Sequence, residues 1–536
     1  MRNRLILLLM IGIAGFGQVR EEYRAFWADT FNTALNNRGD IVNAVNMVKD
    51  AGGNAIFAQV RRRGDTWALK SLEKTPDFVA IEPGFDPLEA LVSEAHAKGI
   101  EVHAFVILGA IWNKNPTFAP TASLGAPLDP KHVFNKHGGF DRETGRITPG
   151  PENWLTRTLV PDGTAGITFQ GHRFGSEFWL DFGHPDAAAY TVDVLMELVK
   201  NYDIDGLHLD RIRFPEFAAT GQTPRTGASI GYNAVSVERF QKRFGGGVPE
   251  PGDPVWAQWR RDQVTQVVRR IYLNAVGLKP RLKVSGAFIV YGDGPAADAD
   301  WVNSEAYWRV YQDWRAWLEE GIIDIAIPMN YKREHVAQQA GWAARWDEFT
   351  KRNQYGRMSL IGLGVYLNSI EGTLRQMRRA AASGVGGVAL YALANVDTAV
   401  AANPLSLPAG QNTPARGYAE FRFAVKDANF AYEDGRLFPL PLWGEEARVR
   451  SLPWKERPVA GHVMGFVPGS DGAEVVLVRL LTGDTRRILT DGGGFFGAVD
   501  LAPGQYEVRT SKEGVVTREV VNVEAGWVTK VDLVVR

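Results

Sequence analysis

The sequence contains no cysteine in its 536 residues. Disulfide bonds, thiolate metal sites and cysteine nucleophiles are therefore excluded. An excess of charge of either sign is missing too, because the formal net charge is −1, whereas a nucleic-acid-binding protein carries a basic surface. We therefore expect no nucleic-acid partner.

The motifs of several cofactor-dependent enzymes are also missing. The nine histidines are dispersed and form no HExxH sequence, which argues against a metalloprotease. No Walker loop occurs, which argues against a P-loop nucleotide site. We expect no metal site, no other cofactor and no serine nucleophile elbow.

Long apolar runs are scarce, and the clearest one lies at the amino terminus. LILLLMIGIAGF follows two positive charges in MRNR and precedes small residues near Gly17. The run is shorter than the roughly 20 apolar residues that a membrane helix needs, so we predict a cleaved signal peptide over residues 1–18 rather than an anchor. An exported chain without disulfides favours the periplasm or cell envelope of a bacterium. No later segment is expected to span a membrane.

Tryptophan and glycine are abundant, with 16 and 57 residues. A surplus of aromatic side chains suits a protein core, and it also suits sites that stack against sugar rings. Hydrophobic residues make up 45% of the chain and charged residues 23%, which is typical of a globular protein. The length predicts two or more domains.

Short apolar strands alternate with amphipathic helices from residue 23 onward. In the first helix, Ile41, Val45 and Val48 keep helical spacing and Gly52 follows the end. No glycine-rich phosphate loop follows the first strand, so the α/β pattern favours a TIM (β/α)8 barrel over a doubly wound sheet. The eight expected strands are residues 24–31, 54–61, 101–108, 205–212, 283–290, 324–331, 359–366 and 387–394.

The alternation stops near Gly417, and the chain then changes character. We predict a barrel over residues 19–425, a linker against the barrel over 426–457 and a small β-sandwich over 458–536. The stretch TDGGGFFGAVDLAPGQYEVRTS is similar to carboxypeptidase-regulatory-like (prealbumin-like) modules. This resemblance implies an accessory domain without chemistry of its own.

Polar residues collect at the end of the fourth expected strand, in DGLHLDRIRFP. If Leu207 and Leu209 face the helices, His208 and Asp210 face the barrel interior. Asp210 then stands at the carboxyl end of the strand, where barrel enzymes place catalytic groups. The alternative is a purely structural aspartate that pairs with Arg61, Arg211 or Arg213.

The same alternation predicts a polar ring over one mouth of the barrel. Asp29 and Asp65, which follow the first two strands, are further site candidates, although Asp65 also suits a solvated turn. An acidic, aromatic-rich cleft of this kind suits glycoside hydrolysis, in which one carboxylate acts as acid and another as base or nucleophile. The predicted ring consists of Gln59, Arg61, His103, His208, Asp210 and Asn330.

Seven motifs resemble, in order and spacing, the bacterial glycosyl hydrolase-like family 10: EYRAFWADTF, AIFAQVRRRGD, EVHAFV, WLDFGHPDAAAY, DGLHLDRIRFP, IPMNY and the closing GVALYAL. The resemblance covers about residues 21–400. It implies a TIM-barrel glycosidase of the cell envelope that acts on peptide-free peptidoglycan strands or on related amino-sugar polysaccharides. It also implies that Asp210 is the central catalytic carboxylate.

The partner carboxylate is left open, because many family members have a second aspartate where this chain has Arg211. The candidates are Asp29, Asp65, Glu216, Asp293 and Glu334, of which Asp65, Glu216 and Glu334 are taken as catalytic with Asp210. Retention and inversion of configuration both stay open. The residues expected to bind the polysaccharide are Asp29, Gln59, Arg61, His103, His208, Arg211, Asn330 and Tyr331.

Two other functions remain as alternatives. An α-glucan or galactoside hydrolase would also place an aspartate after the fourth strand, and a glycan-binding envelope protein without catalysis would suit the departure at Arg211. A xylanase is disfavoured, because the seventh strand is followed by no acid until Glu371.

Overall fold

The computed structural model describes residues 20–113, 126–138, 152–159, 165–166, 177–216, 229–399, 415–427, 429–430, 441–512 and 514–534. The predicted signal peptide lies outside these ranges. Within them, no helix combines the length and the apolar character that a membrane span requires.

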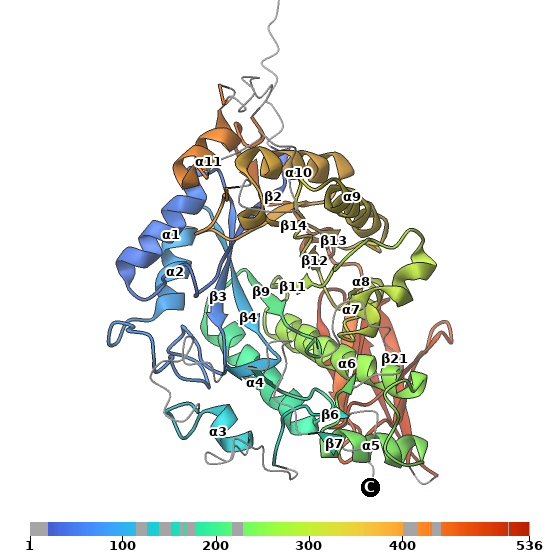
Figure 1. The fold of residues 1–536 in the computed structure, drawn as a ribbon. Helices are drawn as coiled ribbons and strands as arrows, with labels where there is room; N and C mark the ends of the chain where they lie inside the picture. The colour runs from blue at the N-terminus through green and yellow to red at the C-terminus, as the bar shows by residue number, and fades with distance from the viewer. Residues whose placement is uncertain are drawn as a thin grey trace, which may run out of the picture.

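Parallel strands close into the predicted barrel (Figure 1). The last strand pairs with the first, with Tyr391 opposite Trp27. Two short strands separated only by Leu360 share one position, so the barrel has eight positions and the TIM-barrel prediction is confirmed. The strands are β2 (Tyr23–Ala28), β3 (Ala55–Arg61), β4 (Glu101–Ile107), β9 (Gly206–Asp210), β11 (Lys283–Phe288), β12 (Ile325–Pro328), β13 (Met358–Ser359) with β14 (Ile361–Gly364), and β15 (Gly387–Tyr391).

Amphipathic helices cover the outside of the barrel (Figure 1). In the first, Asn37 caps the helix by accepting a hydrogen bond of 3.0 Å from Asp40 N, and the apolar stripe through Val45 is buried. The helices are α1 (Arg38–Asp50), α2 (Pro87–His96), α4 (Pro185–Asn201), α6 (Pro254–Leu278), α7 (Glu305–Trp308), α8 (Trp314–Glu320), α9 (Ala337–Arg352), α10 (Ile370–Ser383) and α11 (Gly417–Lys426).

Two separate apolar cores follow from the strand alternation. The outer core lies between strands and helices and contains Leu207 and Leu209, as the sequence predicted. The inner core fills the barrel and includes Trp27, Phe57 and Phe105. Because these side chains fill the barrel interior, only residues at the ends of the strands are free to line a cavity.

The connections after β4 and β9 carry extra elements on the carboxyl-terminal side of the barrel. After β4 come β5 (Ala110–Asn113), α3 (Val133–His137), β6 (Thr158–Leu159), β7 (Ala165–Gly166) and β8 (Glu177–Trp179), and after β9 come β10 (Ser229–Ile230) and α5 (Ala234–Phe244). The β5 and β8 strands pair antiparallel, which holds β8 over the barrel mouth.

The carboxyl-terminal residues form two packed sheets around their own apolar core. Between barrel and sheets lie β16 (Ala447–Arg448), which pairs with β1 (Arg20–Glu21), and α12 (Pro453–Glu456). The sheet strands are β17 (Gly461–Phe466), β18 (Glu474–Arg479), β19 (Thr485–Leu489), β20 (Phe495–Leu501), β21 (Gly504–Lys512), β22 (Val515–Val523) and β23 (Val528–Lys530).

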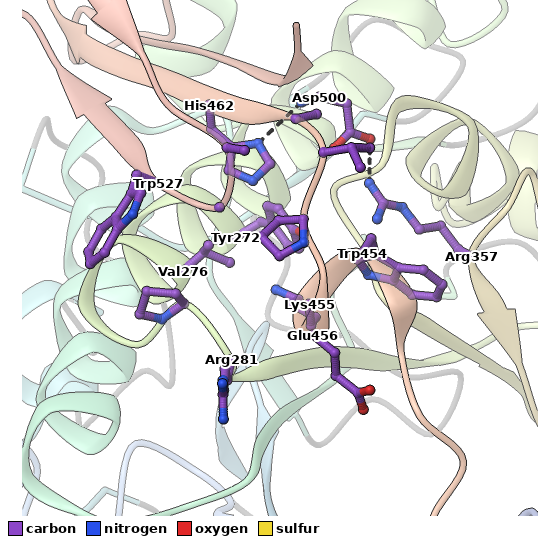
Figure 2. Close-up of a pocket in the computed structure, with 16 residues that line it drawn as sticks. Tyr272, Val276, Arg281, Arg357, Trp454, Lys455, Glu456, His462, Asp500 and Trp527 are labelled. Atoms are coloured by element: carbon purple, nitrogen blue, oxygen red, sulfur yellow. Dashed lines mark hydrogen bonds and ion pairs between the residues drawn. The ribbon is translucent and has the colours of Figure 1, made fainter. Parts of the chain in front are cut away.

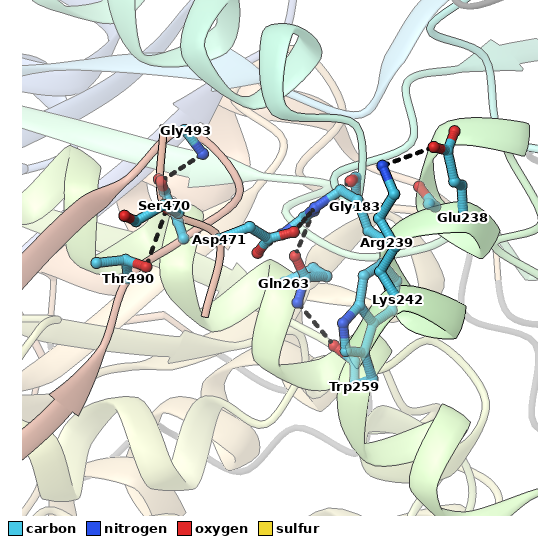
Figure 3. A network of polar contacts seen from close by, with 12 residues as sticks. Gly183, Glu238, Arg239, Lys242, Trp259, Gln263, Ser470, Asp471, Thr490 and Gly493 are labelled. Carbon is cyan, nitrogen blue, oxygen red and sulfur yellow. Dashed lines mark hydrogen bonds and ion pairs between the residues drawn. The ribbon is translucent and has the colours of Figure 1, made fainter. Parts of the chain in front are cut away.

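The two-sheet unit, red in Figure 1, lies against α5 and α6. Arg239 of α5 makes a bidentate ion pair with Asp471, at 2.6 and 2.7 Å, and also bonds Gln263 of α6 at 2.9 Å (Figure 3). Arg270 of α6 lies 3.2 Å from Asp491. These two partly buried ion pairs therefore help to fix the unit on the barrel.

Candidate active site

A cavity of about 770 Å³ opens at the carboxyl ends of the barrel strands. Its acidic lining residues are Asp210, Glu216 and Glu305, and nine aromatic side chains also line it. This volume lies within the range of about 300–1,000 Å³ that small-molecule sites occupy. The cavity is therefore the candidate active site.

Asp210 ends β9 and stands in register with Ile107 of β4, one level above His208. Burial raises the pKa of Asp210, and the nearby charges of Arg211 and Arg213 offset part of that rise. Its Oδ1 accepts a 2.7 Å hydrogen bond from the backbone N–H of Arg211. A carboxyl group with a raised pKa is suited to hold a proton for a leaving group.

Arg211 turns the chain sharply at the end of β9. Its φ of 51° is left-handed, a conformation that is uncommon for a residue other than glycine and is found at functional sites. The guanidinium donates from Nη1 to Glu177 Oε2 at 2.6 Å and lies over the ring of Trp179. The Glu177 charge also contributes to the raised pKa of Asp210.

Glu216 lies six residues beyond Asp210 and lines the same cavity. The Tyr291 hydroxyl donates a hydrogen bond to Glu216 Oε1, and Arg213 Nη2 is 3.7 Å from the same oxygen. Both neighbours are donors, so Glu216 is held as an acceptor. Asp210 and Glu216 are thus the two predicted catalytic carboxylates that share the cavity.

The floor of the cavity is aromatic. Tyr331 and Tyr391 stack with their ring centres 5.6 Å apart, and Trp27 meets each of them edge to face. Trp27 Nε1 donates to His208 Nε2 at 2.9 Å, so the proton of this imidazole is on Nδ1, which faces Ser285 Oγ at 2.9 Å. Burial holds the pKa of His208 well below its usual value, so it stays neutral and orients Trp27.

Gln59 lies at the edge of this floor and lines the cavity. Its Oε1 accepts hydrogen bonds from the backbone N–H and the hydroxyl of Thr30, at 2.9 and 2.7 Å. These bonds fix the amide plane, so the NH2 group is the part of Gln59 that is suited to a ligand.

Three residues of the predicted polar ring lie elsewhere. Arg61 forms a buried bidentate pair with Glu73, at 2.7 and 2.7 Å, because a bulge after Gln59 breaks the alternation. His103 points inward, but it is in register with Gly206 of β9, four residues before Asp210. There it contacts Glu101 at 3.2 Å. Asn330 points outward, and its amide bonds α9 at Asp347 Oδ1 over 2.8 Å.

The other candidate carboxylates are also outside the cavity lining. Asp65 is buried in a separate cavity of about 90 Å³, and burial raises its pKa. Asp29 caps the turn after β2 by accepting from the backbone N–H groups of Phe31 and Asn32, each at 3.0 Å. Its pKa is also raised by burial.

The last two candidates form ion pairs away from the cavity. Glu334 is 3.0 Å from Arg379, and Asp293 forms an exposed pair with Arg345. Both carboxylates therefore have cationic partners of their own.

Several residues at the cavity are not among the site residues that the sequence predicts. Trp27 and Tyr391 could have been found, since they are the inward-facing residues at the ends of the first and last strands. Glu305, which lines the cavity, and Glu177, which pairs with the lining residue Arg211, gave no signal, because they lie in connections whose path the strand pattern does not fix. The Glu305 carboxylate forms an ion pair with Arg309.

A GxSxG sequence does occur at residues 227–231, and its serine is not a nucleophile elbow. Ser229 lies in β10, where its hydroxyl bonds Arg260 Nη1 at 2.7 Å and Tyr311 at 3.4 Å. The elbow requires a turn from a barrel or sheet strand into a helix, and β10 is instead paired antiparallel with β6.

Comparison with curated proteins identifies distant relatives of this chain. Glycosyl hydrolase YngK of Bacillus subtilis is 23% identical over 332 residues, which are 59% of this chain and 55% of that protein. Glycosyl hydrolase DigH of Escherichia coli K12 is 22% identical over 306 residues, 54% of this chain and 57% of that protein. The chain thus spans little more than half the length of these relatives.

Among solved structures, the glycoside hydrolase domain of PgaB (BpsB) from Bordetella bronchiseptica aligns with a TM-score of 0.45 at 14% identity, over 69% of this chain and 94% of that one. The catalytic domain of a β-amylase from Paenibacillus polymyxa aligns with a TM-score of 0.46 at 11% identity, over 70% and 94%.

The family comparison bears on the barrel alone. The likeness of the carboxyl-terminal unit to carboxypeptidase-regulatory-like modules stays a prediction. Residues 154–373 match the model of the family described as Glycosyl hydrolase-like 10. This match confirms the predicted resemblance to that family over residues 154–373.

Proposed function

We propose that this chain is a glycoside hydrolase that cleaves peptidoglycan glycan strands or a related amino-sugar polysaccharide. The observation that carries the proposal is the presence of Asp210 and Glu216 in one aromatic-floored cavity. Hydrolysis of a glycosidic bond needs two carboxyl groups on either side of the bond, one as acid and one as base or nucleophile. In this proposal the chain is exported and acts in the periplasm or cell envelope.

The surroundings of the two carboxyl groups suggest their roles. Asp210, whose pKa burial raises, is the general acid that protonates the departing oxygen. Glu216, which accepts from Tyr291 and faces Arg213, is the base or nucleophile. The stacked Tyr331 and Tyr391 rings offer an apolar surface to one face of a sugar.

Cationic residues that line the cavity favour a substrate that carries carboxylate groups. Arg333 lines the cavity and makes no ion pair with any described residue, whereas Arg211 and Arg309 have acidic partners. An uncompensated guanidinium favours a carboxylate ligand through bidentate hydrogen bonds. Peptide-free peptidoglycan strands carry such a group on alternate sugars, whereas starch and xylose polymers without acidic branches do not.

Reducing-end release from a panel of glycans tests the proposal. The panel holds peptide-free peptidoglycan strands, poly-N-acetylglucosamine, starch and xylan, each treated with the wild-type chain and with Asp210→Asn. We expect cleavage of an amino-sugar polymer that the variant loses by a factor of about 10² or more, since acid–base groups contribute about 10²–10⁴. Cleavage of starch alone would contradict the substrate, and retention without cleavage would indicate a binding protein.

A further inference from the structure

A second cavity of about 470 Å³ lies between the barrel and the two-sheet unit (Figure 2). Its barrel side includes Arg281, two residues before β11, and Arg357, one residue before β13. It therefore opens at the amino ends of the strands, on the face opposite Asp210. None of the residues assigned to the proposed hydrolysis lines this cavity.

Aromatic rings stand on opposite sides of this cavity. Trp527 of the two-sheet unit is 61% exposed, and Trp454 of α12 faces it across the opening (Figure 2). Trp454 is held firmly, because its Nε1 donates to the buried Asp324 at 2.7 Å and the Arg357 guanidinium lies 5.0 Å from its ring centre. An exposed tryptophan across the cavity from a fixed one leaves a flat apolar surface available to a ligand.

The charges inside the cavity largely cancel. Lys455 Nζ is 3.1 Å from Asp324 Oδ2, and Arg357 forms an ion pair with Asp500. Of the other lining residues that the structure describes, Arg281 supplies one cation and Glu456 one anion, and neither makes an ion pair. The balance favours an uncharged ligand over an anion or a cation.

The polar groups nevertheless offer both kinds of hydrogen bond. Arg281 can only donate and Glu456 can only accept, and both lie at the lower side of the cavity (Figure 2). The Lys455 ammonium is already paired with Asp324 and lies 4.7 Å from the ring centre of Tyr272. A hydroxyl group, which donates and accepts, would satisfy such a set.

We propose that this cavity binds an uncharged sugar ring of a glycan chain. A sugar presents an apolar C–H face to Trp527 and hydroxyl groups to Arg281 and Glu456. The volume of about 470 Å³ suits a ligand of one or two rings. Since the cavity is on the opposite face from Asp210, it holds the polymer without cleaving it and raises the local concentration of chain near the enzyme.

Binding stoichiometry tests this proposal without any need for catalysis. Chitotetraose, cellotetraose and maltotetraose are titrated by calorimetry into the full chain with Asp210→Asn, which prevents cleavage. We expect at least one probe to bind, and we expect the number bound per chain to fall by one when Trp527→Ala is added. Trp527→Phe, which keeps an aromatic face, retains the site, and Arg281→Ala weakens it tenfold or more.

Leu481→Ala is the matched control, because Leu481 is 84% exposed on the same unit and does not line the cavity. It leaves the stoichiometry unchanged. Equal numbers of ligand bound with and without Trp527→Ala would overturn the proposal, and so would the absence of binding by all three probes. A chain that fails to hydrolyse any glycan can still lose one bound ligand, so this result is independent of the proposed activity.

Discussion

At the scale of single residues, the protonation of Asp210 depends on burial and on two arginines. Burial raises its pKa, while Arg211 and Arg213 lower it. The general-acid role requires the protonated form, so activity is lost as the pH rises through this pKa. The charge of Arg211 is therefore one of the contributions that determine the basic limit of the pH profile.

Arg211→Met is expected to move the basic limb of the kcat–pH profile to higher pH, because the pKa of Asp210 rises when the cation is removed. The freed Glu177 acts in the same direction. Arg211→Lys keeps the charge and leaves the limb in place. Movement of the acidic limb instead would show that Asp210 acts in its ionised form, which contradicts the assignment.

Arg333 is expected to discriminate between charged and uncharged glycans. Arg333→Met removes a cavity-wall cation that makes no ion pair with any described residue, so KM for peptide-free peptidoglycan strands rises about tenfold, as the loss of a charge-assisted hydrogen bond of about 1.5 kcal/mol implies. KM for poly-N-acetylglucosamine stays unchanged, and Arg333→Lys loses less. An equal rise for both polymers would mean that Arg333 recognises no carboxylate.

At the scale of elements, strand alternation explains how much could be predicted. The eight strands and the inward direction of His208 and Asp210 follow from apolar spacing alone. Apolar spacing does not show how far along the barrel axis a side chain lies. His103 points inward as predicted, but it lies near the amino end of β4, away from the cavity. Glu216 was one candidate among several, because its place depends on the path of the connection after β9.

The bulge in β3 gives Arg61 a structural role that its position in the sequence hides. Arg61→Met leaves Glu73 buried without its cation, and removal of one member of a buried pair costs about 3–5 kcal/mol. Urea unfolding should show this loss, while KM stays the same. Lys70→Met, which breaks an exposed pair with Glu89, costs at most about 1 kcal/mol. If the Arg61→Met chain were as stable as wild type and had a raised KM, Arg61 would be a substrate-binding residue and the structural role would be contradicted.

At the scale of the whole molecule, the barrel and the two-sheet unit are joined by buried polar contacts. His462 of β17 lies in this junction, where its Nδ1 accepts from Asp500 N at 3.2 Å (Figure 2). Burial lowers the pKa of His462 to about 4, below the usual value of about 6.5. The junction is therefore sensitive to acid.

The free energy of unfolding is expected to fall as the pH drops from about 6.5 towards 4, because the unfolded chain then binds a proton that folded His462 does not. The loss from one such group is about 1.4 kcal/mol per pH unit. His462→Asn keeps an acceptor for Asp500 N and removes the titration, so its stability depends less on pH. Parallel curves for the two chains, measured by urea unfolding at each pH, would exclude His462 as the cause.

The central claim is that Asp210 and Glu216 form the catalytic pair, and carboxylate-to-amide variants test it most directly. We would measure kcat/KM on the cleaved glycan for Asp210→Asn, Glu216→Gln, Asp65→Asn and Glu334→Gln, each confirmed as folded by circular dichroism. The first two are predicted to lose a factor of about 10²–10⁴, and the last two to stay within about tenfold of wild type, since their carboxylates do not line the cavity. A fully active Glu216→Gln beside an inactive Asp65→Asn or Glu334→Gln would contradict the account.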